Sequence, residues 1–375
     1  MKSVDVIVVG GGVAGATATY HLAKLGNSVL MFDKRHLNPH KSCGGGMASS
    51  VQKWFTFDLL PVVDEVIKRV EFTWKLEDKT VANLPGTSPF WIVRRENLDA
   101  LITNEAIKKG AEIINPISIV DIQKFNNLWI VKDEQNREYS SKGLIIANGS
   151  NSIWSNKLGI GAKKPHYAYT TSVRLQGRGN VSDGVSRFEF GLVHHGFAWA
   201  FPIKEGVNIG IGTFIGNNKT DTSAILKKLL PDLGFSPNEG TRIEGKLSVW
   251  NGHHKLNGDG VVAIGDAASL CDPFLAEGIR PAIMSGFESA KAINFWLKGE
   301  TKNLDNFTAT MQKQWGDSMA WGRRISQVFY RFPKVGYQLG IKRPTAPERI
   351  AQILSGEMGY GDIANRVIKR LVLQK

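Results

Sequence analysis

A run of six residues rich in glycine, GGGVAG at positions 10–15, separates an apolar stretch from a stretch of helix-forming residues. The preceding residues 4–9 (VDVIVV) are mostly β-branched, as in a strand buried on both faces of a parallel sheet. The composition of the following residues, Ala14–Leu25, predicts a helix that ends at Gly26. A second strand over Ser28–Phe32 completes a βαβ unit, so the N-terminal part is expected to form an α/β fold.

The glycine spacing follows the pattern G-x-G-x-x-G, in which each glycine has a structural reason. Gly10 permits a tight turn, Gly12 lets a ligand approach the backbone, and Gly15 allows the helix to pack closely on the strand. The amides at the start of the helix can then bind phosphate. Asp33 follows the second strand and is placed to accept hydrogen bonds from an adenosine ribose. These features predict a dinucleotide site; the alternative is a glycine turn without a ligand.

A similar segment returns far downstream, at residues 258–268 (GDGVVAIGDAA). It predicts a buried strand over Gly260–Ile264 that ends in Gly265-Asp266 and leads into a long helix to about Leu297. A simple NAD domain has no need for this second segment. FAD does need one, because its ribityl chain and isoalloxazine extend beyond the first βαβ unit. Asp266 would hold the ribityl hydroxyls, unless it only caps the next helix.

The 375 residues are too many for one simple core. A helix over Asn97–Lys109 and strands over 111–114, 128–131 and 143–147 continue the α/β pattern. Residues 166–257 instead alternate short strands with Gly and Asn turns, as in an antiparallel sheet. These strands are expected over Phe188–Phe190, Phe197–Phe201, Val207–Ile211 and Lys246–Val249.

The order of these patterns predicts the fold class: α/β, with a Rossmann-like FAD-binding domain interleaved with an antiparallel-sheet substrate domain, plus a C-terminal helical segment. The FAD-binding domain is expected to be discontinuous, over residues 1–70, 94–165 and 258–299. The substrate domain would take residues 71–93 and 166–257, and a basic helical region residues 300–375.

Four motifs then resemble one family. Residues 265–279 (GDAASLCDPFLAEGI) resemble the second FAD motif of the p-hydroxybenzoate hydroxylase-like flavoproteins, and within them the geranylgeranyl reductase family. Residues 41–46 (KSCGGG) resemble that family's lysine–cysteine–glycine loop beside the flavin, and residues 95–99 (RENLD) its Arg-x-x-hydrophobe-Asp element. Residues 197–202 (FAWAFP) resemble its aromatic-x-Trp-x-Phe-Pro strand. The resemblance spans roughly residues 1–300.

Two positions depart from the pattern of the family. Asn148-Gly149 stands where the superfamily usually carries Asp-Gly, and Asn has no charge to offer. Phe197 stands where the family commonly has Tyr, which removes a hydroxyl beside the expected pocket.

The resemblance implies an FAD site with the ADP half on the glycine loop and Asp33, and with Arg95 near the middle of the cofactor. Pro273 would pack near the isoalloxazine, and the Gly278–Ile279 backbone would face its pyrimidine edge. The complete set of expected cofactor-binding residues is Gly10, Gly12, Gly15, Asp33, Lys34, Cys43, Gly44, Arg95, Gly265, Asp266, Pro273, Gly278 and Ile279.

The resemblance also implies an activity, saturation of isoprenoid C=C bonds in a geranylgeranyl-type diphosphate or prenylated lipid. Phe197, Trp199 and Phe201 share one face of a strand and would form an aromatic wall, or else belong to the core. Cys43 is the candidate proton donor; alternatively it only packs, or pairs with Cys271 as a redox couple. The expected catalytic residues are therefore Cys43, Phe197 and Trp199.

Two other functions remain open. One is an FAD-dependent monooxygenase or halogenase of the same superfamily acting on an aromatic substrate, although residues 197–202 match the halogenase Trp-x-Trp-x-Ile-Pro element only in part. The other is a flavin redox carrier without its own substrate. The chain has no second G-x-G-x-x-G motif, so an external donor such as NAD(P)H or ferredoxin would bind transiently. No metal site is expected, because His194-His195 and His253-His254 would point to opposite faces of strands.

The net charge of +13 is concentrated near the C-terminus, where residues 301–375 hold 13 Lys and Arg against 5 Asp and Glu. We expect a basic amphipathic helix here that either rests on anionic lipid or a diphosphate, or packs on its own domain. Its apolar residues would be Trp321, Ile325, Val328, Phe329 and Phe332, flanked by Arg323, Arg324 and Arg331.

Three features predict a cytoplasmic protein that is at most peripheral to a membrane. The chain has only two cysteines, it begins with a strand in place of a signal peptide, and it lacks a run of about 20 apolar residues. An anionic membrane surface is a candidate partner, and nucleic acid is not expected to be one.

Overall fold

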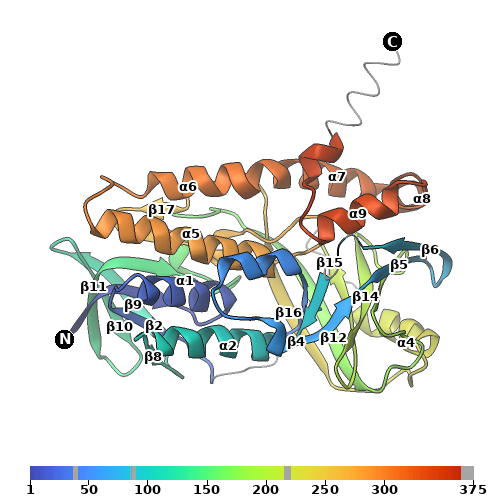
Figure 1. Cartoon of the computed structure of the whole chain (residues 1–375), viewed down its shortest axis with the longest axis horizontal. Helices are drawn as coiled ribbons and strands as arrows, with labels where there is room; N and C mark the ends of the chain where they lie inside the picture. Colours follow the sequence, from blue (N-terminus) through green and yellow to red (C-terminus); the bar gives the residue numbers. More distant parts are fainter. Residues whose placement is uncertain (37–40, 85, 87–89, 215–220, 365–375) are drawn as a thin grey trace, which may run out of the picture.

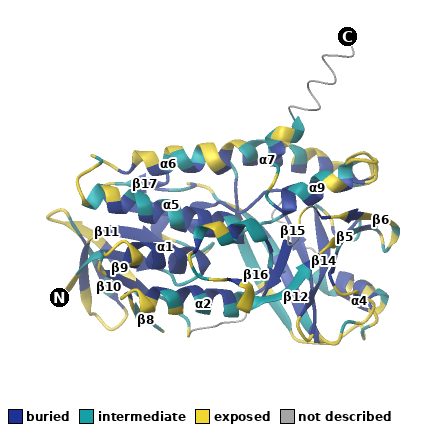
Figure 2. Ribbon diagram, viewed as in Figure 1, coloured by how far each residue is buried: buried dark blue, intermediate teal, exposed yellow. Residues whose placement is uncertain are grey.

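The computed structural model describes residues 1–36, 41–84, 86, 90–214 and 221–364. Two large sheets lie end to end, and the C-terminal helices run along the upper side of the molecule, whereas a further helix lies on the opposite side of the second sheet (Figure 1). This is the α/β fold that the sequence predicts, with a Rossmann-like part, an antiparallel part and C-terminal helices. Its interior is dark in Figure 2, where α1 and the central strands are buried and the outer faces of α6 and α7 are exposed.

The first sheet has eight strands, five of them parallel. β1 (Lys2–Val9) lies in its middle, between β11 (Glu138–Ile146) and β2 (Val29–Phe32), and pairs with both in parallel. β18 (Val261–Ala263) pairs in parallel with β11, and β8 (Glu112–Ile114) with β2. The predicted βαβ unit is confirmed, and the late strand β18 is only two places away from it. The carboxyl ends of these strands therefore meet at one edge, where α/β proteins place their ligands.

The remaining strands of this sheet are antiparallel. β10 (Leu128–Asp133) pairs with β11 and with β9 (Ile119–Phe125), and β17 (Asn257–Gly258) pairs with β18. β11 begins several residues earlier than the sequence predicts, because its first residues pair with β10.

Three helices pack over this sheet: α1 (Val13–Lys24), α2 (Arg95–Lys108) and α5 (Ile279–Leu297). α1 and α5 approach each other closely, since a Cβ on Gly286 would lie 2.6 Å from the carbonyl oxygen of Ala14. This contact holds the two halves of the expected cofactor site together.

The prediction of a helix directly after Gly265-Asp266 is wrong. A short 3₁₀ turn, η3 (Gly265–Ala268), comes first, and α5 begins only at Ile279. The reason is local: Ser269 and Ala276 both have φ of 56°, which a right-handed helix cannot accommodate. Between them, the buried Asp272 accepts hydrogen bonds from the amides of Phe274 (2.6 Å) and Leu275 (3.1 Å) and holds a loop.

The second sheet has seven strands in the order β16-β12-β15-β14-β13-β5-β6. All neighbours are antiparallel except β13 and β5. The bounds are β5 (Arg69–Trp74), β6 (Glu77–Asn83), β12 (His166–Gln176), β13 (Val185–Phe190), β14 (Gly196–Ile203), β15 (Gly206–Thr213) and β16 (Arg242–Val249).

Both faces of β14 are buried, each against a different part of the protein. Ala198 and Ala200 belong to a small core that includes Leu226 of α4 (Thr222–Asp232). Phe197, Trp199 and Phe201 point the other way and join the main core, which continues into the first sheet. The alternation predicted for this strand is thus present, and it directs three aromatic rings into the core that continues into the first sheet.

A third sheet of three strands connects the two large ones: β3 (Gly46–Ala48), β7 (Phe90–Val93) and β4 (Val63–Ile67). Two 3₁₀ turns, η1 (Ser49–Trp54) and η2 (Leu60–Val62), lie beside it in sequence, and a one-turn helix α3 (Trp154–Lys157) follows β11.

The C-terminal region consists of α6 (Asp305–Met311), a π-helical turn over residues 312–316, α7 (Asp317–Arg331), α8 (Pro333–Gly340) and α9 (Ala346–Leu354). Buried tyrosines anchor it: Tyr330 donates to the carbonyl of Phe274 (2.8 Å), Tyr337 to that of Phe72 (3.0 Å), and Tyr360 to Asp272 (2.7 Å). No helix of the described ranges is both long and apolar enough to span a bilayer.

The single apolar stripe predicted for α7 is wrong. Phe329 is buried and Trp321 and Ile325 are half-buried, whereas Val328 and Phe332 are 67% and 58% exposed. The helix ends at Arg331 and Phe332 continues into α8, so the five predicted residues divide between a buried group, with Phe329, and an exposed group, Val328 and Phe332.

Candidate cofactor and substrate site

A cavity of about 710 Å³ lies between the carboxyl ends of β1 and β2 and the aromatic face of β14. Ten of the expected cofactor-binding residues line it: Gly10, Gly12, Asp33, Lys34, Cys43, Gly44, Arg95, Asp266, Gly278 and Ile279. Phe197, Trp199 and Phe201 line it as well. Segments from widely separated parts of the sequence therefore meet around one space of the size of a ligand site.

The glycine loop has the geometry that its spacing predicts. Gly10 has φ of +113°, and a Cβ there would lie 2.4 Å from the carbonyl oxygen of Ala147. A Cβ on Gly15 would lie 1.8 Å from the carbonyl oxygen of Gly10, so this glycine serves helix–strand packing. A Cβ on Gly12 would meet only Lys41 Nζ, at 3.6 Å, and would otherwise enter the cavity. The backbone at Gly12 is thus open to a diphosphate at the N-terminus of α1.

Asp33 lies beside this loop and is already hydrogen-bonded within the protein. It accepts from the amide of Gly11 (2.8 Å), the amide of Arg35 (2.9 Å) and the guanidinium of Arg35 (2.9 and 3.1 Å). Burial opposes ionisation, but Arg35 and the two amides hold the pKa of Asp33 below its ordinary value. A carboxylate has about four acceptor positions, so Arg35 would have to release Asp33 for it to bind a ribose.

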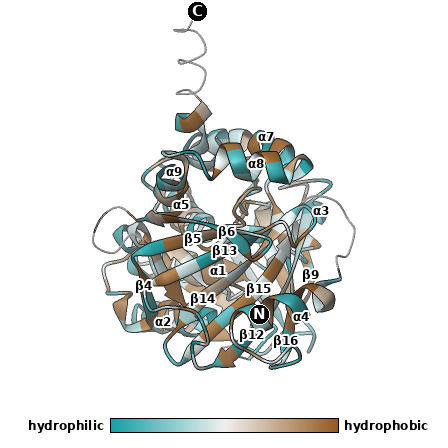
Figure 3. Cartoon of the chain, turned by 90° about the vertical axis from the view of Figure 1, so that its right-hand side faces the viewer, coloured by the Kyte–Doolittle hydropathy of each residue, from teal (hydrophilic) through white to brown (hydrophobic). Residues whose placement is uncertain are grey.

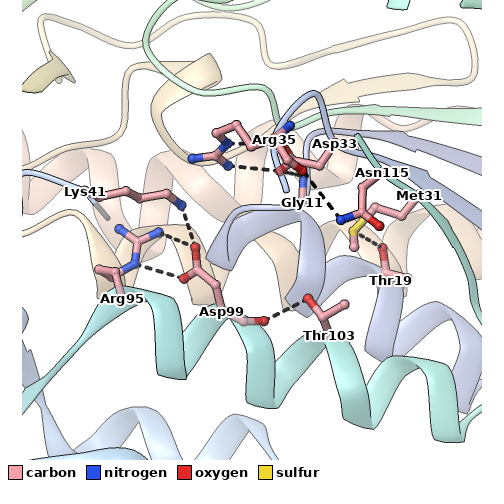
Figure 4. A network of polar contacts seen from close by, with 10 residues as sticks. All are labelled: Gly11, Thr19, Met31, Asp33, Arg35, Lys41, Arg95, Asp99, Thr103 and Asn115. Atoms are coloured by element: carbon pink, nitrogen blue, oxygen red, sulfur yellow. Dashed lines mark hydrogen bonds and ion pairs between the residues drawn. The ribbon is translucent and has the colours of Figure 1, made fainter. Parts of the chain in front are cut away.

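Next to the loop, two cations share one buried carboxylate (Figure 4). Asp99 accepts from Lys41 Nζ at 2.5 Å and from Arg95 at 2.9 and 3.1 Å. Burial opposes ionisation of Asp99, yet the two cations lower its pKa; burial and Arg95 lower the pKa of Lys41. The cluster keeps one positive charge in excess beside Gly12, which suits a diphosphate.

Sequence reasoning assigned no role to Lys41 or Asp99. Both belong to motifs that carried the family resemblance, residues 41–46 and 95–99, so a signal was present. Their meeting depends on the tertiary fold, because the loop of Lys41 reaches the first two turns of α2.

Asp266 lines the cavity on the other side. Burial raises its pKa to about 6, against the attraction of Arg95 and Lys41. Gly265 and Pro273 are buried and do not line the cavity; a Cβ on Gly265 would lie 2.9 Å from that of Ala14. In the described part of the chain, these two residues and Gly15 therefore pack behind the residues that line the cavity.

Glu277, which the sequence analysis did not single out, also lines the cavity. Its side chain is 8% exposed, and one carboxylate oxygen accepts from Arg280 at 2.6 Å. The other, Oε1, has no hydrogen-bond partner among the described residues. Burial raises the pKa of Glu277 to about 7, with Arg280 lowering it and Asp272 raising it. With this pKa, the carboxyl group beside Gly278 and Ile279 is about half protonated at neutral pH.

The aromatic wall lies against the Cys43 loop. A Cβ on Gly44 would lie 2.8 Å from the ring of Phe201 and 3.2 Å from Nε1 of Trp199. Trp199 covers Gly210 of β15, where a Cβ would lie 2.1 Å from its ring. Asn208 donates to the carbonyl of Cys43 at 2.7 Å and fixes the loop on β15. The three rings are core residues and cavity wall at the same time, so the two readings of the sequence do not exclude each other.

The two cysteines differ in their surroundings. Cys43 lines the cavity, whereas Cys271 is fully buried and burial raises its pKa well above the ordinary value. Both thiols are free.

The geometric reason given for excluding a histidine metal site is wrong. His194 and His195 lie in the turn before β14, with ring centroids 3.8 Å apart, and not on a strand. His253 and His254 lie in a loop, where His254 contacts Asn251 (2.7 Å) and His253 contacts Asp317 (3.5 Å).

These features fit FAD. Gly12 leaves room for the diphosphate, and Lys41 and Arg95 supply charge. Asn148 also lines the cavity, and its buried Oδ1 has no hydrogen-bond partner among the described residues. A buried oxygen of this kind is costly unless a ligand or water donates to it.

Comparisons with known proteins agree. Residues 5–56 match the family of FAD dependent oxidoreductases. The chain is 27% identical over 324 residues to digeranylgeranylglycerophospholipid reductase 1 of Methanosphaera stadtmanae, covering 78% of this chain and 76% of that protein. A geranylgeranyl bacteriochlorophyll reductase-like protein of Thermoplasma acidophilum superposes with a TM-score of 0.78 at 21% identity, over 95% of this chain and 92% of that one. The flavin-dependent brominase Bmp2 superposes with a TM-score of 0.73 at 19% identity, over 100% of both chains.

The chain is an FAD-dependent oxidoreductase, and the expectation of FAD as cofactor is confirmed. Within that class it is similar in sequence to a digeranylgeranylglycerophospholipid reductase and in fold to a geranylgeranyl bacteriochlorophyll reductase-like protein. The likeness to the brominase concerns the fold alone.

Proposed function

We propose that this protein saturates C=C bonds of an isoprenoid, either a geranylgeranyl-type diphosphate or a prenylated lipid. The observation that carries the proposal is the continuity of one cavity from the phosphate loop at Gly12 to the aromatic wall of Phe197, Trp199 and Phe201. An alkene offers no polar group to hold, so a wall of rings is the suitable way to position it and exclude water.

Reduced FAD bound in this cavity would supply the hydride to one alkene carbon, and the protein must deliver a proton to the other. Two groups of the cavity wall are candidates, the thiol of Cys43 and the carboxyl group of Glu277. Glu277 has the advantage of a pKa of about 7, near the value at which general acid catalysis is most effective.

The remaining roles of the expected cofactor-binding residues are part of the same proposal. Gly10, Gly12, Asp33 and Lys34 would hold the ADP half, Arg95 and Lys41 the diphosphate, and Asp266 the ribityl chain. An external electron donor, NAD(P)H or ferredoxin, would bind transiently. The cofactor would bind to the domain of residues 1–70, 94–165 and 258–299, and the substrate to the domain of residues 71–93 and 166–257. We also propose a cytoplasmic protein that meets its lipid substrate at a membrane surface.

The second candidate is an FAD-dependent halogenase or monooxygenase acting on an aromatic substrate, favoured by the fold that the chain shares with Bmp2. A flavin carrier without a substrate is less consistent with a cavity that continues past the phosphate loop to the aromatic wall.

Anaerobic turnover distinguishes these functions. The purified protein should be yellow, and after chemical reduction it should add hydrogens to geranylgeranyl diphosphate or to a prenyl lipid in the absence of oxygen, as measured by product mass. Oxygen-dependent hydroxylation, or halide-dependent halogenation of an aromatic compound, would replace the reductase assignment and leave the FAD assignment intact.

A further inference from the structure

The hairpin of α7 and α8 carries an exposed apolar surface at its outer side. Val328, Phe332, Val335 and Leu339 are 67%, 58%, 55% and 53% exposed. They are four of the thirteen exposed large apolar side chains in the described ranges, yet all four fall within twelve residues. Single exposed apolar residues are ordinary, but a cluster indicates a surface that something covers.

This surface belongs to a firmly held element. Directly beside the exposed residues, Phe329 packs on Phe190 and Phe274 with ring centroids 5.4 and 5.2 Å apart, and the hydroxyl of Tyr337 donates to Phe72. One side of the hairpin is therefore part of the core, and the other projects from the protein (Figure 3).

The charge around the cluster is mainly positive, although Asp78 lies against α8, where it accepts from Gln338 and pairs with Lys342. Residues 318–347 contain six Lys and Arg and no Asp or Glu. Arg324, Arg331, Lys334 and Arg343 are exposed, and within the described ranges none of them forms an ion pair with an acid. Apolar side chains surrounded by cations are the composition that binds at the interface of an anionic bilayer.

We propose that the α7–α8 hairpin docks this protein on the surface of an anionic lipid membrane. A second copy of the chain fits the surface poorly, because a two-fold contact would bring the exposed cations against their own equivalents. The proposal concerns binding alone and does not need the reductase chemistry.

The hairpin also connects to the site. Tyr330 of α7 donates to the carbonyl of Phe274, and Leu275 and Ala276, the next residues, line the cavity. Leu354 at the end of α9 lines it too. A membrane on the outer side of the hairpin would therefore lie against the elements that close the substrate half of the cavity.

Co-sedimentation of the full-length, FAD-loaded protein with phosphatidylcholine vesicles, with and without phosphatidylserine, tests the proposal without any substrate. We expect binding to the anionic vesicles that weakens with salt. Phe332→Asp and Val328→Asp should abolish it, and Arg331→Gln and Lys334→Gln should each weaken it about fivefold. The controls are Phe125→Asp, at a position as exposed as Val328 but on β9, and Lys109→Gln at the end of α2.

All four variants lie at exposed positions and should keep the flavin absorbance of the parent protein. Equal binding to both kinds of vesicle, or binding that the hairpin variants do not reduce, would overturn the proposal. A dimer in size-exclusion chromatography that Phe332→Asp dissociates would overturn it in favour of a second copy. Loss of reductase activity with intact vesicle binding would count against the proposed function only.

Discussion

Lys41 lies directly over Gly12: its ammonium nitrogen is 3.6 Å from the point that a Cβ on Gly12 would occupy. The two residues come from different loops, and Asp99 holds the lysine in this place. The positive charge is thus aimed at the position where the backbone is most open to a diphosphate.

Removing this charge should weaken the cofactor complex. Lys41→Met is expected to raise the Kd for FAD about ten- to a hundredfold, the size of a charge-assisted hydrogen bond of about 1.5–3 kcal/mol. Quenching of FAD fluorescence measures the Kd, with Lys109→Met as the control for overall charge. An unchanged Kd would show that Lys41 only neutralises Asp99.

Two glycines of the same motif should respond differently to alanine. Gly12→Ala meets no close contact and has φ of −73°, so its melting temperature without cofactor should stay the same while FAD binding is lost. Gly15→Ala would bring a methyl group within 1.8 Å of a carbonyl oxygen and should destabilise the fold itself by roughly 1–3 kcal/mol or more. Thermal unfolding of both apoproteins distinguishes the two effects, and equal stabilities would contradict the packing argument.

Arg35 should compete with the cofactor for Asp33. Since its guanidinium occupies two acceptor positions of that carboxylate, Arg35→Ala should tighten FAD binding by up to about fivefold, the range of a partly exposed ion pair. Asp33→Ala should instead abolish tight binding. Titration of the apoprotein with FAD gives both constants. Weaker binding by Arg35→Ala would mean that the arginine itself contacts the cofactor.

One ring of the aromatic wall can be moved by a substitution on β15, outside the cavity lining. In Gly210→Ala the new methyl group would lie 2.1 Å from the ring of Trp199 and should push it into the cavity. We expect KM for the prenyl substrate to rise with the flavin spectrum unchanged. In a Trp199→Ala background, Gly210→Ala should cause no further rise in KM, because the ring that it displaces is absent. If Gly210→Ala raises KM in that background as well, the effect of Gly210 does not act through Trp199.

Glu277 should make stability depend on pH. Its pKa is raised to about 7 from an ordinary 4.5, so the folded state binds a proton that the unfolded state has already released between these values. The stabilisation is complete below about pH 4.5 and disappears as pH rises through 7. As pH rises through this range, the free energy of unfolding of Glu277→Gln should increase relative to that of the parent by an amount on the order of 3 kcal/mol. Denaturant unfolding measures both free energies. A pH-independent difference would contradict the raised pKa.

The same group has a kinetic signature. If Glu277 delivers the proton, alkene reduction by the pre-reduced enzyme should slow above about pH 7, and Glu277→Gln should be slow at every pH. Cys43→Ala would then keep the parent's pH profile. The opposite pattern would assign the proton to Cys43.

Much of the nucleotide half could be read from local sequence. The strand, the glycine turn and the helix of residues 4–25 follow from short-range periodicity and from the steric freedom of glycine, and each glycine occupies the position that its role predicts. The antiparallel strands over residues 166–257 were recognisable for the same reason, since alternation is a property of neighbouring residues. The start of α5 was not, because left-handed Ser269 and Ala276 interrupt a stretch whose composition allows a helix.

What only the tertiary structure decided is which distant groups meet. Three features of the site depend on loops that pack across sheets, and no local pattern encodes those distances. They are the ion pairs of Asp99 with Lys41 and Arg95, the ion pair of Asp33 with Arg35, and the Oε1 of Glu277, which has no partner among the described residues. The exposed side of α7 and α8 is a further case. Its apolar residues look like core residues in sequence, and only the packing of Phe329 and Tyr337 inward leaves Val328 and Leu339 outside. Local periodicity sets the elements, whereas burial and long-range electrostatics set which of their residues become a site.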